Sequence, residues 1–251
     1  MAYANGMRVL VGTAGWSIPR DLTHLFATSG SVLQRYASRF NAVEINSSFY
    51  RPHRDQTYQR WAGDTPDNFT FAVKAPRQVT HEHRLLDATE PLRAFREAIG
   101  HLGDKLGPVL FQLPPRLAFD EAVADRFFAT WRGMFPGLTV CEPRHPSWFS
   151  HVASERLSAA RIGRVIADPP ITPDAADLSG PCVYFRLHGA PVMYESSYCE
   201  PSLERLAERL TASAARAPTW CIFDNTKFGA ATANALTLKG RLGGGTIARK
   251  A

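Results

Sequence analysis

Short apolar runs alternate with longer amphipathic stretches along nearly the whole chain. Runs rich in β-branched and aromatic side chains are typical of strands, and apolar residues spaced three or four positions apart predict helices. The predicted strands are 9–13, 40–45, 69–74, 106–115, 138–142, 164–168, 182–189 and 220–223. The predicted helices are 31–40, 55–62, 91–102, 120–134, 152–162, 202–215 and 230–241.

The alternation of strands with helices indicates a parallel α/β fold, because the connections are too long for hairpins. A chain of 251 residues has the length of a single TIM-type (β/α) barrel. The stretch between residues 168 and 182 is rich in Pro and Asp and has no helical periodicity. The sequence therefore predicts one distorted barrel domain over residues 1–251. We expect the helix between the sixth and seventh strands to be missing or reduced, and residues from about 243 onward to form a flexible tail.

Polar side chains stand where many of the predicted strands end. The carboxyl ends of parallel strands meet at one rim of a barrel, where barrel enzymes keep their chemistry, so we expect these side chains to share a pocket. The candidate catalytic residues are Glu44, Lys74, Glu142, Asp168 and His188. The candidate ligand-binding residues are Trp16, Asn46, Gln112, Arg144, Arg186, Asp224 and Asn225.

This mixture of charges favours general acid and base catalysis, because neighbouring charges and burial tune the pKa values of such groups. Glu142 or Glu44 would be the base, while Lys74 and Arg186 would stabilise developing negative charge. The alternative is an ion-pair network that only holds the strand ends together. The number of charges at one rim exceeds what closure of a barrel requires, which favours the catalytic interpretation.

The net charge favours an anionic ligand. Lys and Arg total 29 against 23 Asp and Glu, which gives a net charge of +6 and a pI near 9.3. We expect an anionic or sugar-like small molecule as the partner. Nucleic acid stays an alternative, with Trp16, Tyr50 and Trp148 as candidates to stack on bases.

A metal site is the less favoured interpretation. The pair His81 and His83 is a weak signal by itself, and a divalent ion on Glu142, Asp168 and His188 would face repulsion from lysine and arginine at the same rim. We therefore expect neither a metal nor a cofactor.

The cysteines and the hydropathy pattern bear on the compartment. Cys141, Cys182, Cys199 and Cys221 form no Cys-x-x-Cys pair, and buried free thiols in a reducing compartment are the expected state. No apolar stretch is long enough for a signal peptide or a membrane span. The expectation is a cytoplasmic protein without a membrane partner.

Several of these segments together resemble the domain-of-unknown-function family 72, also called YecE-like. The segments are 12–16, 40–51, 71–74, 106–115, 142–149, 186–189, 224–225 and 234–236. The resemblance implies a distorted TIM-type barrel related to sugar isomerases and likened to abasic-site endonucleases, without a settled activity. Two positions depart from the family pattern. Residues 17–20 form a short first loop in place of an aromatic-rich one, and Asp224 stands where Asn is frequent, which adds a carboxylate to the rim.

These observations lead to three functional hypotheses. The favoured one is a metal-independent enzyme with isomerase-like or lyase-like acid and base chemistry on a sugar-like or phosphorylated small molecule. The second is a nucleic-acid binding or processing protein, acting as a phosphodiester hydrolase. The third is a ligand-binding protein without catalysis.

Overall fold

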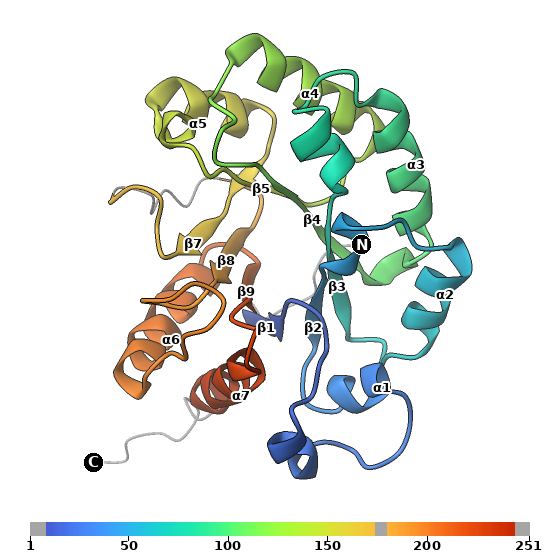
Figure 1. Ribbon diagram of the computed structural model, residues 1–251, viewed down its shortest axis with the longest axis vertical. Coiled ribbons are helices and arrows are strands. Elements are labelled where there is room, and N and C mark those ends of the chain that lie inside the picture. The colour runs from blue at the N-terminus through green and yellow to red at the C-terminus, as the bar shows by residue number, and fades with distance from the viewer. Residues whose placement is uncertain (1–8, 174–179, 244–251) are drawn as a thin grey trace.

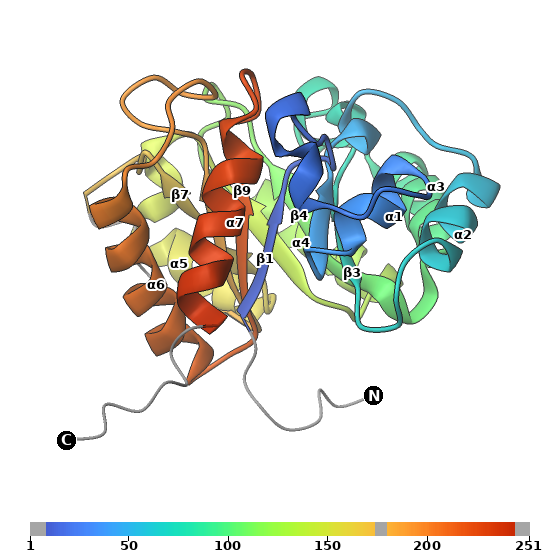
Figure 2. The ribbon, with the colours of Figure 1, turned by 90° about the horizontal axis from the view of Figure 1, so that it is seen from below.

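The computed structural model describes residues 9–173 and 180–243, with parallel strands at the centre and helices around them (Figure 1). The strands are β1 (Val9–Thr13), β2 (Ala42–Ile45), β3 (Thr70–Lys74), β4 (Leu106–Gln112), β5 (Thr139–Glu142), β6 (Gly163–Arg164), β7 (Ile166–Asp168), β8 (Val183–Leu187) and β9 (Thr219–Phe223). The α-helices are α1 (Val32–Ala37), α2 (Asp55–Gly63), α3 (Thr89–Gly100), α4 (Glu121–Met134), α5 (His151–Ala159), α6 (Glu200–Ala214) and α7 (Ala230–Gly243). Figure 2 shows α6 and α7 on one side of the strands and α1, α2 and α3 on the other.

The strands form two parallel sheets, with the orders β1-β9-β8-β7 and β2-β3-β4-β5-β6. The expectation of a single closed barrel is therefore not confirmed, although the parallel α/β architecture is. The strand predicted at 164–168 is divided at Val165, so that β6 pairs with β5 and β7 pairs with β8. At the other junction only Ala14 and Glu44 form a bridge, and the amide of Gly15 donates to the carbonyl of Glu44 at 2.8 Å.

A glycine permits the close approach of β1 to β2. A Cβ atom on Gly12 would lie 2.2 Å from the carbonyl oxygen of Ala42, which no side chain tolerates. In the sequence, the contact between β1 and β2 is therefore marked by one glycine, Gly12, and not by a run of strand-forming residues.

Helix ends follow the capping residues. Ser31 caps α1 through a capping box with Gln34, and the carboxylate of Asp120 accepts from the amide of Val123 at 2.9 Å at the start of α4. Residues 169–173 and 180–182 contain no helix, in agreement with the predicted loss of the helix between β7 and β8, while residues 174–179 lie outside the described residues. The predicted tail also lies outside them, except for Gly243, which ends α7. No helix in the described ranges is long and apolar enough to cross a membrane.

Two apolar layers hold the strands. The outer layer lies between strands and helices and includes Phe71, Phe111 and Trp131, all fully buried. The inner layer lies on the opposite face of the same strands and comprises Leu10, Ala42, Ala72, Leu110, Val140, Val165, Cys182, Tyr184, Trp220 and Ile222. Burial of both faces explains why the strands are continuous apolar runs without a polar face.

Candidate active site

The candidate site continues the inner apolar layer by one step along the strands. Residues two apart in a strand share a face. Glu44 therefore follows Ala42, Lys74 follows Ala72, Glu142 follows Val140, and Arg186 and His188 follow Tyr184 on the same inner face. On the inner face of these strands, the side chain is therefore apolar at one position and charged two residues later, at the carboxyl end.

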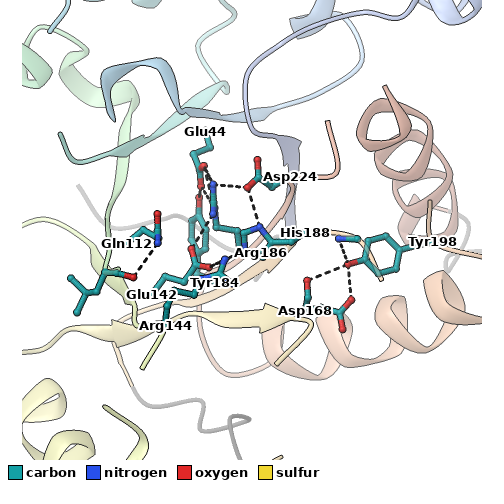
Figure 3. Close-up of polar contacts among 12 residues, drawn as sticks. Glu44, Gln112, Glu142, Arg144, Asp168, Tyr184, Arg186, His188, Tyr198 and Asp224 are labelled. Atoms are coloured by element: carbon teal, nitrogen blue, oxygen red, sulfur yellow. Dashed lines mark hydrogen bonds and ion pairs between the residues drawn. The ribbon is translucent and has the colours of Figure 1, made fainter. Parts of the chain in front are cut away.

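Six charged or titratable side chains contact one another at the carboxyl ends of the strands, and we call them the charged cluster: Glu44, Glu142, Arg144, Arg186, His188 and Asp224 (Figure 3). Glu44 and Glu142 come from one sheet and Arg186 from the other, while Asp224 follows β9. The cluster therefore joins the strand ends of both sheets.

Arg186 is the centre of this cluster. Its guanidinium lies 2.8 Å from Glu44 Oε1, 3.0 Å from Glu142 Oε2 and 2.9 Å from Asp224 Oδ2, and its side chain is 1% exposed. Burial disfavours the charged form of Arg186, but the charges of Asp224, Glu44 and Glu142 outweigh burial and hold its pKa well above the ordinary value. Arg186 is thus a fixed cation that compensates three buried carboxylates.

His188 lies between two of these carboxylates. Its Nδ1 is 3.0 Å from Asp224 Oδ2, and its Nε2 is 2.8 Å from Glu142 Oε1 and 2.5 Å from Arg144 Nη2. A protonated ring can donate to both carboxylates, whereas a neutral ring with its proton on Nδ1 can donate to Asp224 and accept from Arg144. Each protonation state of the ring therefore has partners in place.

The carboxylates of Glu142 and Asp224 are held ionised. Burial raises the pKa of Glu142, but Arg186, Arg144 and His188 together hold it below its ordinary value. Burial also raises the pKa of Asp224, but the charge of Arg186 and the hydrogen bond from His188 outweigh burial and hold this pKa below its ordinary value. Both groups are acceptors rather than proton donors near neutral pH.

Tyr184 completes the surroundings of Glu44. Its hydroxyl donates to Glu44 Oε2 at 2.8 Å, and both residues are fully buried. Burial and the negative charge of Glu44 raise the pKa of Tyr184 well above its ordinary value, so this hydroxyl keeps its proton. The alternation of the predicted strand 182–189 marks Tyr184 as an inward residue, but no sequence signal paired it with a glutamate far away in the chain.

Lys74 stands beside the charged cluster without joining it. Its Nζ lies 4.0 Å from the ring centroid of Phe49, and within the described residues no hydrogen bond or ion pair reaches it. The residue is 6% exposed. Burial and the repulsion of Arg186 lower the pKa of Lys74 to about 8, against the opposing pull of the three carboxylates of the cluster.

This pKa has a measurable consequence for stability. Because the pKa of Lys74 falls from 10.5 to about 8 on folding, the unfolded chain binds more protons between these pH values. The stability of the protein relative to a Lys74→Met variant should therefore rise by about 2–3 kcal/mol as the pH increases from about 8 to about 10.5. Urea unfolding of both proteins across this range measures the difference.

The control for this experiment is Lys227→Met, because the Lys227 side chain is 56% exposed and paired with Glu195. Its stability difference from the unaltered protein should change by less than about 0.5 kcal/mol over the same range. A flat difference for Lys74→Met as well would contradict the description of Lys74 as a desolvated amine.

Four predicted site residues have other partners. Asp168 Oδ2 accepts from the hydroxyl of Tyr198 at 2.6 Å, apart from the cluster (Figure 3), and borders a cavity of about 660 Å³ between β7, β8 and α6. Asn225 donates to Asn234 Oδ1 at 2.9 Å and so joins the end of β9 to α7. Gln112 donates to the carbonyl of its neighbour Leu113 at 3.0 Å. Trp16 packs edge-on against Trp61, with ring centroids 5.0 Å apart.

Asn46 is the sixth predicted residue outside the charged cluster, after Lys74 and these four. Its Oδ1 is buried and has no hydrogen-bond partner within the described residues. Such an atom costs free energy unless a ligand or water satisfies it, so Asn46 remains a candidate for binding a donor group.

A loop residue that the sequence did not single out covers part of the cluster. The ring of Tyr194 lies edge-on to His188, with centroids 5.5 Å apart, and the backbone amide of Tyr194 donates to the carbonyl of His188. Tyr194 is 44% exposed, so it stands between His188 and solvent. Its segment has no strand or helix periodicity from which this position could be predicted.

The structure bears on two alternatives to the favoured hypothesis, the nucleic-acid interface and the metal site. Trp148 is 1% exposed and donates to the carbonyl of Leu117 at 2.9 Å, so its prediction as a base-stacking residue is wrong. In the described part of the chain, no three His, Cys, Asp or Glu side chains are arranged to hold a metal ion, and Asp168 is turned to Tyr198. Of the aromatic residues considered for stacking, Tyr50 is exposed.

Comparison with known sequences identifies relatives without an assigned activity. Residues 10–250 match the family described as "Protein of unknown function DUF72". The UPF0759 protein YunF of Bacillus subtilis (strain 168) is 31% identical over 150 residues, which cover 57% of this chain and 52% of YunF. The UPF0759 protein YecE of Escherichia coli (strain K12) is 29% identical over 167 residues, which cover 64% of this chain and 59% of YecE. The chain thus spans little more than half the length of these curated relatives.

Solved structures agree on the fold. A DUF72 family protein of Thermotoga maritima MSB8 superposes with a TM-score of 0.80 at 27% identity, covering 94% of this chain and 99% of that protein. A DUF72 family protein of Enterococcus faecalis V583 superposes with a TM-score of 0.79 at 22% identity, covering 94% and 96%. Their descriptions name no reaction, so the chemistry has to be argued from the site.

Proposed function

The chain belongs to the DUF72 family, and we propose that its charged cluster is the active site of a metal-independent enzyme that transfers protons on a sugar-like or phosphorylated small molecule. The observation that carries this proposal is the position of His188, whose two ring nitrogens face the carboxylates of Asp224 and Glu142 at 3.0 and 2.8 Å. A proton-transfer residue needs a stable place in both protonation states, and these contacts supply it.

His188 is a better general base than the glutamates of the cluster. Hydrogen bonds engage the oxygens of Glu44 and Glu142 as well as both ring nitrogens of His188, but protonation favours the imidazole, because its two N–H groups then face the carboxylates of Asp224 and Glu142. Positive neighbours also hold the pKa of Glu142 low, which weakens it as a base. The roles of Glu142 and Asp224 in this proposal are to orient the imidazole and to stabilise its protonated form.

Recognition of the ligand rests on polar groups that are not saturated by the cluster. Within the part of the chain that the structure describes, Lys74 offers an amine without an ion pair, and Asn46 offers a buried oxygen without a donor. An amine donor and an amide oxygen acceptor suit a ligand that carries both oxygen acceptors and hydroxyl donors, as sugars and their phosphates do.

We also propose that the two sheets act as one barrel-like wall around this ligand, because residues from both contact Arg186.

Energetics also favour function over a purely structural network. A buried network of ion pairs is seldom more stabilising than well-packed apolar side chains of similar volume. The cluster lies next to the inner apolar layer, and Leu or Val at its positions would simply extend that layer. The charged residues are therefore not needed to fill this space. The cations Arg186, Arg144 and Lys74 would repel a metal ion, which supports chemistry carried by the side chains alone.

Ligand-induced stabilisation tests this proposal. Thermal unfolding in the presence of a chelator and a panel of hexose phosphates, triose phosphates and keto acids should raise Tm for at least one compound, because binding to the native state adds stability. At a ligand concentration of about 100 times Kd the gain is about 2.7 kcal/mol. The same compound should give a smaller shift with Lys74→Met than with the Lys227→Met control.

A failure of all these compounds to stabilise the protein would contradict the proposal and favour the structural network. A shift that disappears when the chelator is added would contradict the metal-independent part.

A further inference from the structure

Lys74 differs from every other lysine that the structure describes. The ammonium of Lys105 donates to the carbonyl of Ala62 at 2.6 Å, that of Lys227 contacts Glu195 at 2.5 Å, and that of Lys239 contacts the carbonyl of Arg39. The nitrogen of Lys74 lies over the ring of Phe49, and among residues 9–173 and 180–243 it has no hydrogen bond or ion pair. It is also the only buried lysine among the described residues, whereas the buried cations Arg186 and Arg164 are arginines.

The three carboxylates near Lys74 are engaged by other side chains. Those of Glu44, Glu142 and Asp224 all contact Arg186, the first with a further bond from Tyr184 and the other two with contacts to His188. Burial without an ion pair favours the neutral amine of a lysine. With a pKa of about 8, roughly one amine in ten is neutral at pH 7, against about one in three thousand for an ordinary lysine.

We propose that Lys74 is a nucleophile that forms a Schiff base with the carbonyl carbon of the substrate. The substrate class of the site is then an aldose, a ketose or a keto acid in its open-chain carbonyl form. This inference rests on the proposed function and names the substrate class for the same site. A position that needed only a fixed positive charge would be served by arginine, whose guanidinium cannot act as this nucleophile.

The reaction uses no oxidant and no reductant. The neutral amine attacks the carbonyl carbon, a C–N bond forms, and the carbonyl π electrons move to the oxygen, which takes up a proton. The nitrogen loses a proton, a second proton from the solvent converts the hydroxyl group into water, the C–O bond breaks as this water leaves, and the nitrogen lone pair forms the C=N bond of the protonated imine. The cationic imine acidifies the adjacent C–H bond, whose proton passes to His188 while the electron pair moves toward nitrogen and forms the enamine.

Reductive trapping tests this step directly. The full-length protein is incubated with dihydroxyacetone phosphate, glyceraldehyde or pyruvate, then treated with sodium borohydride, and its peptides are analysed by mass spectrometry. Hydride addition to the imine carbon should leave Lys74 heavier by the mass of the carbonyl compound minus one oxygen atom. Glycerol 3-phosphate, which has the same skeleton as dihydroxyacetone phosphate but no carbonyl group, should leave no adduct.

Two variants separate a nucleophile from an anchoring charge. Lys74→Arg keeps the positive charge and Lys74→Met removes it, and both should lose the adduct and at least about 100-fold in turnover. If Lys74→Arg keeps turnover within about tenfold of the unaltered protein, Lys74 is an anchor and the inference is overturned. Lys239→Arg, far from the cluster on α7, should keep both adduct and turnover.

The outcomes distinguish this inference from the proposed function. Stabilisation by a carbonyl compound without an adduct on Lys74 would overturn the Schiff base and leave the proposed function standing. Absence of both stabilisation and adduct would contradict both. Equal labelling of Lys74 and the exposed Lys227 would also overturn the inference, because surface amines need no built site.

Discussion

Replacement of Arg186 with methionine is expected to lower the free energy of unfolding by about 3–5 kcal/mol at neutral pH. The reason is that Glu44, Glu142 and Asp224 would remain buried without the cation that contacts all three. The uncompensated carboxylates would then have raised pKa values in the folded state. Stability should therefore recover as the pH falls through about 5 and the carboxylates are protonated.

Urea unfolding of the variant between about pH 4 and 8 measures this effect. Arg93→Met is the matched control, because Arg93 is 58% exposed and lies 3.6 Å from Glu90, a surface ion pair worth less than about 1 kcal/mol. An Arg186→Met protein as stable as the control at neutral pH would show that the carboxylates are not held by Arg186 as described.

Replacement of His188 with glutamine is expected to lower kcat by about 10²–10⁴-fold and to leave KM nearly unchanged. General acid and base catalysis contributes a factor of this size, and a glutamine amide keeps hydrogen-bonding capacity but neither accepts nor releases a proton near neutral pH. Steady-state kinetics with the compound that stabilises the protein provide the measurement.

The control variant is His151→Gln, since the His151 side chain is 87% exposed and faces only Glu155 on α5. It should leave kcat unchanged. If His188→Gln lowers kcat and Tm together while KM rises by the same factor as kcat falls, His188 has a structural role and the assignment of the proton-transfer residue is wrong.

The period-two pattern of the strands explains why much of the candidate site could be predicted. Inward positions of a buried strand are fixed by local alternation, so Glu44, Glu142 and Arg186 could be placed at one rim from their own strands. Asp168 follows the same pattern, but its strand breaks at Val165, and its carboxylate contacts Tyr198 near the start of α6. A local pattern does not report this change of partner.

Other features depend on contacts between distant segments. Tyr184 and Glu44 are 140 residues apart, and Tyr194 reaches His188 from a loop without regular structure. The division of the strands into two sheets depends on the break at Val165, and the close approach of the two sheets at β1 and β2 depends on Gly12, but neither residue changes the hydrophobic pattern. The low pKa of Lys74 follows from burial and from the repulsion of Arg186, which together exceed the opposing effect of the nearby carboxylates, and only the folded chain reveals this balance.

The central claim, that the charged cluster transfers protons on a small molecule, is tested most directly by hydrogen exchange in D₂O. The full-length protein is incubated with dihydroxyacetone phosphate, glyceraldehyde or pyruvate, and proton NMR follows the C–H groups next to the carbonyl. The account predicts deuterium incorporation that is far faster than the buffer background and that falls by about 10²–10⁴-fold with His188→Gln. Incorporation at the background rate with the unaltered protein, or at the same rate with His188→Gln, would contradict it.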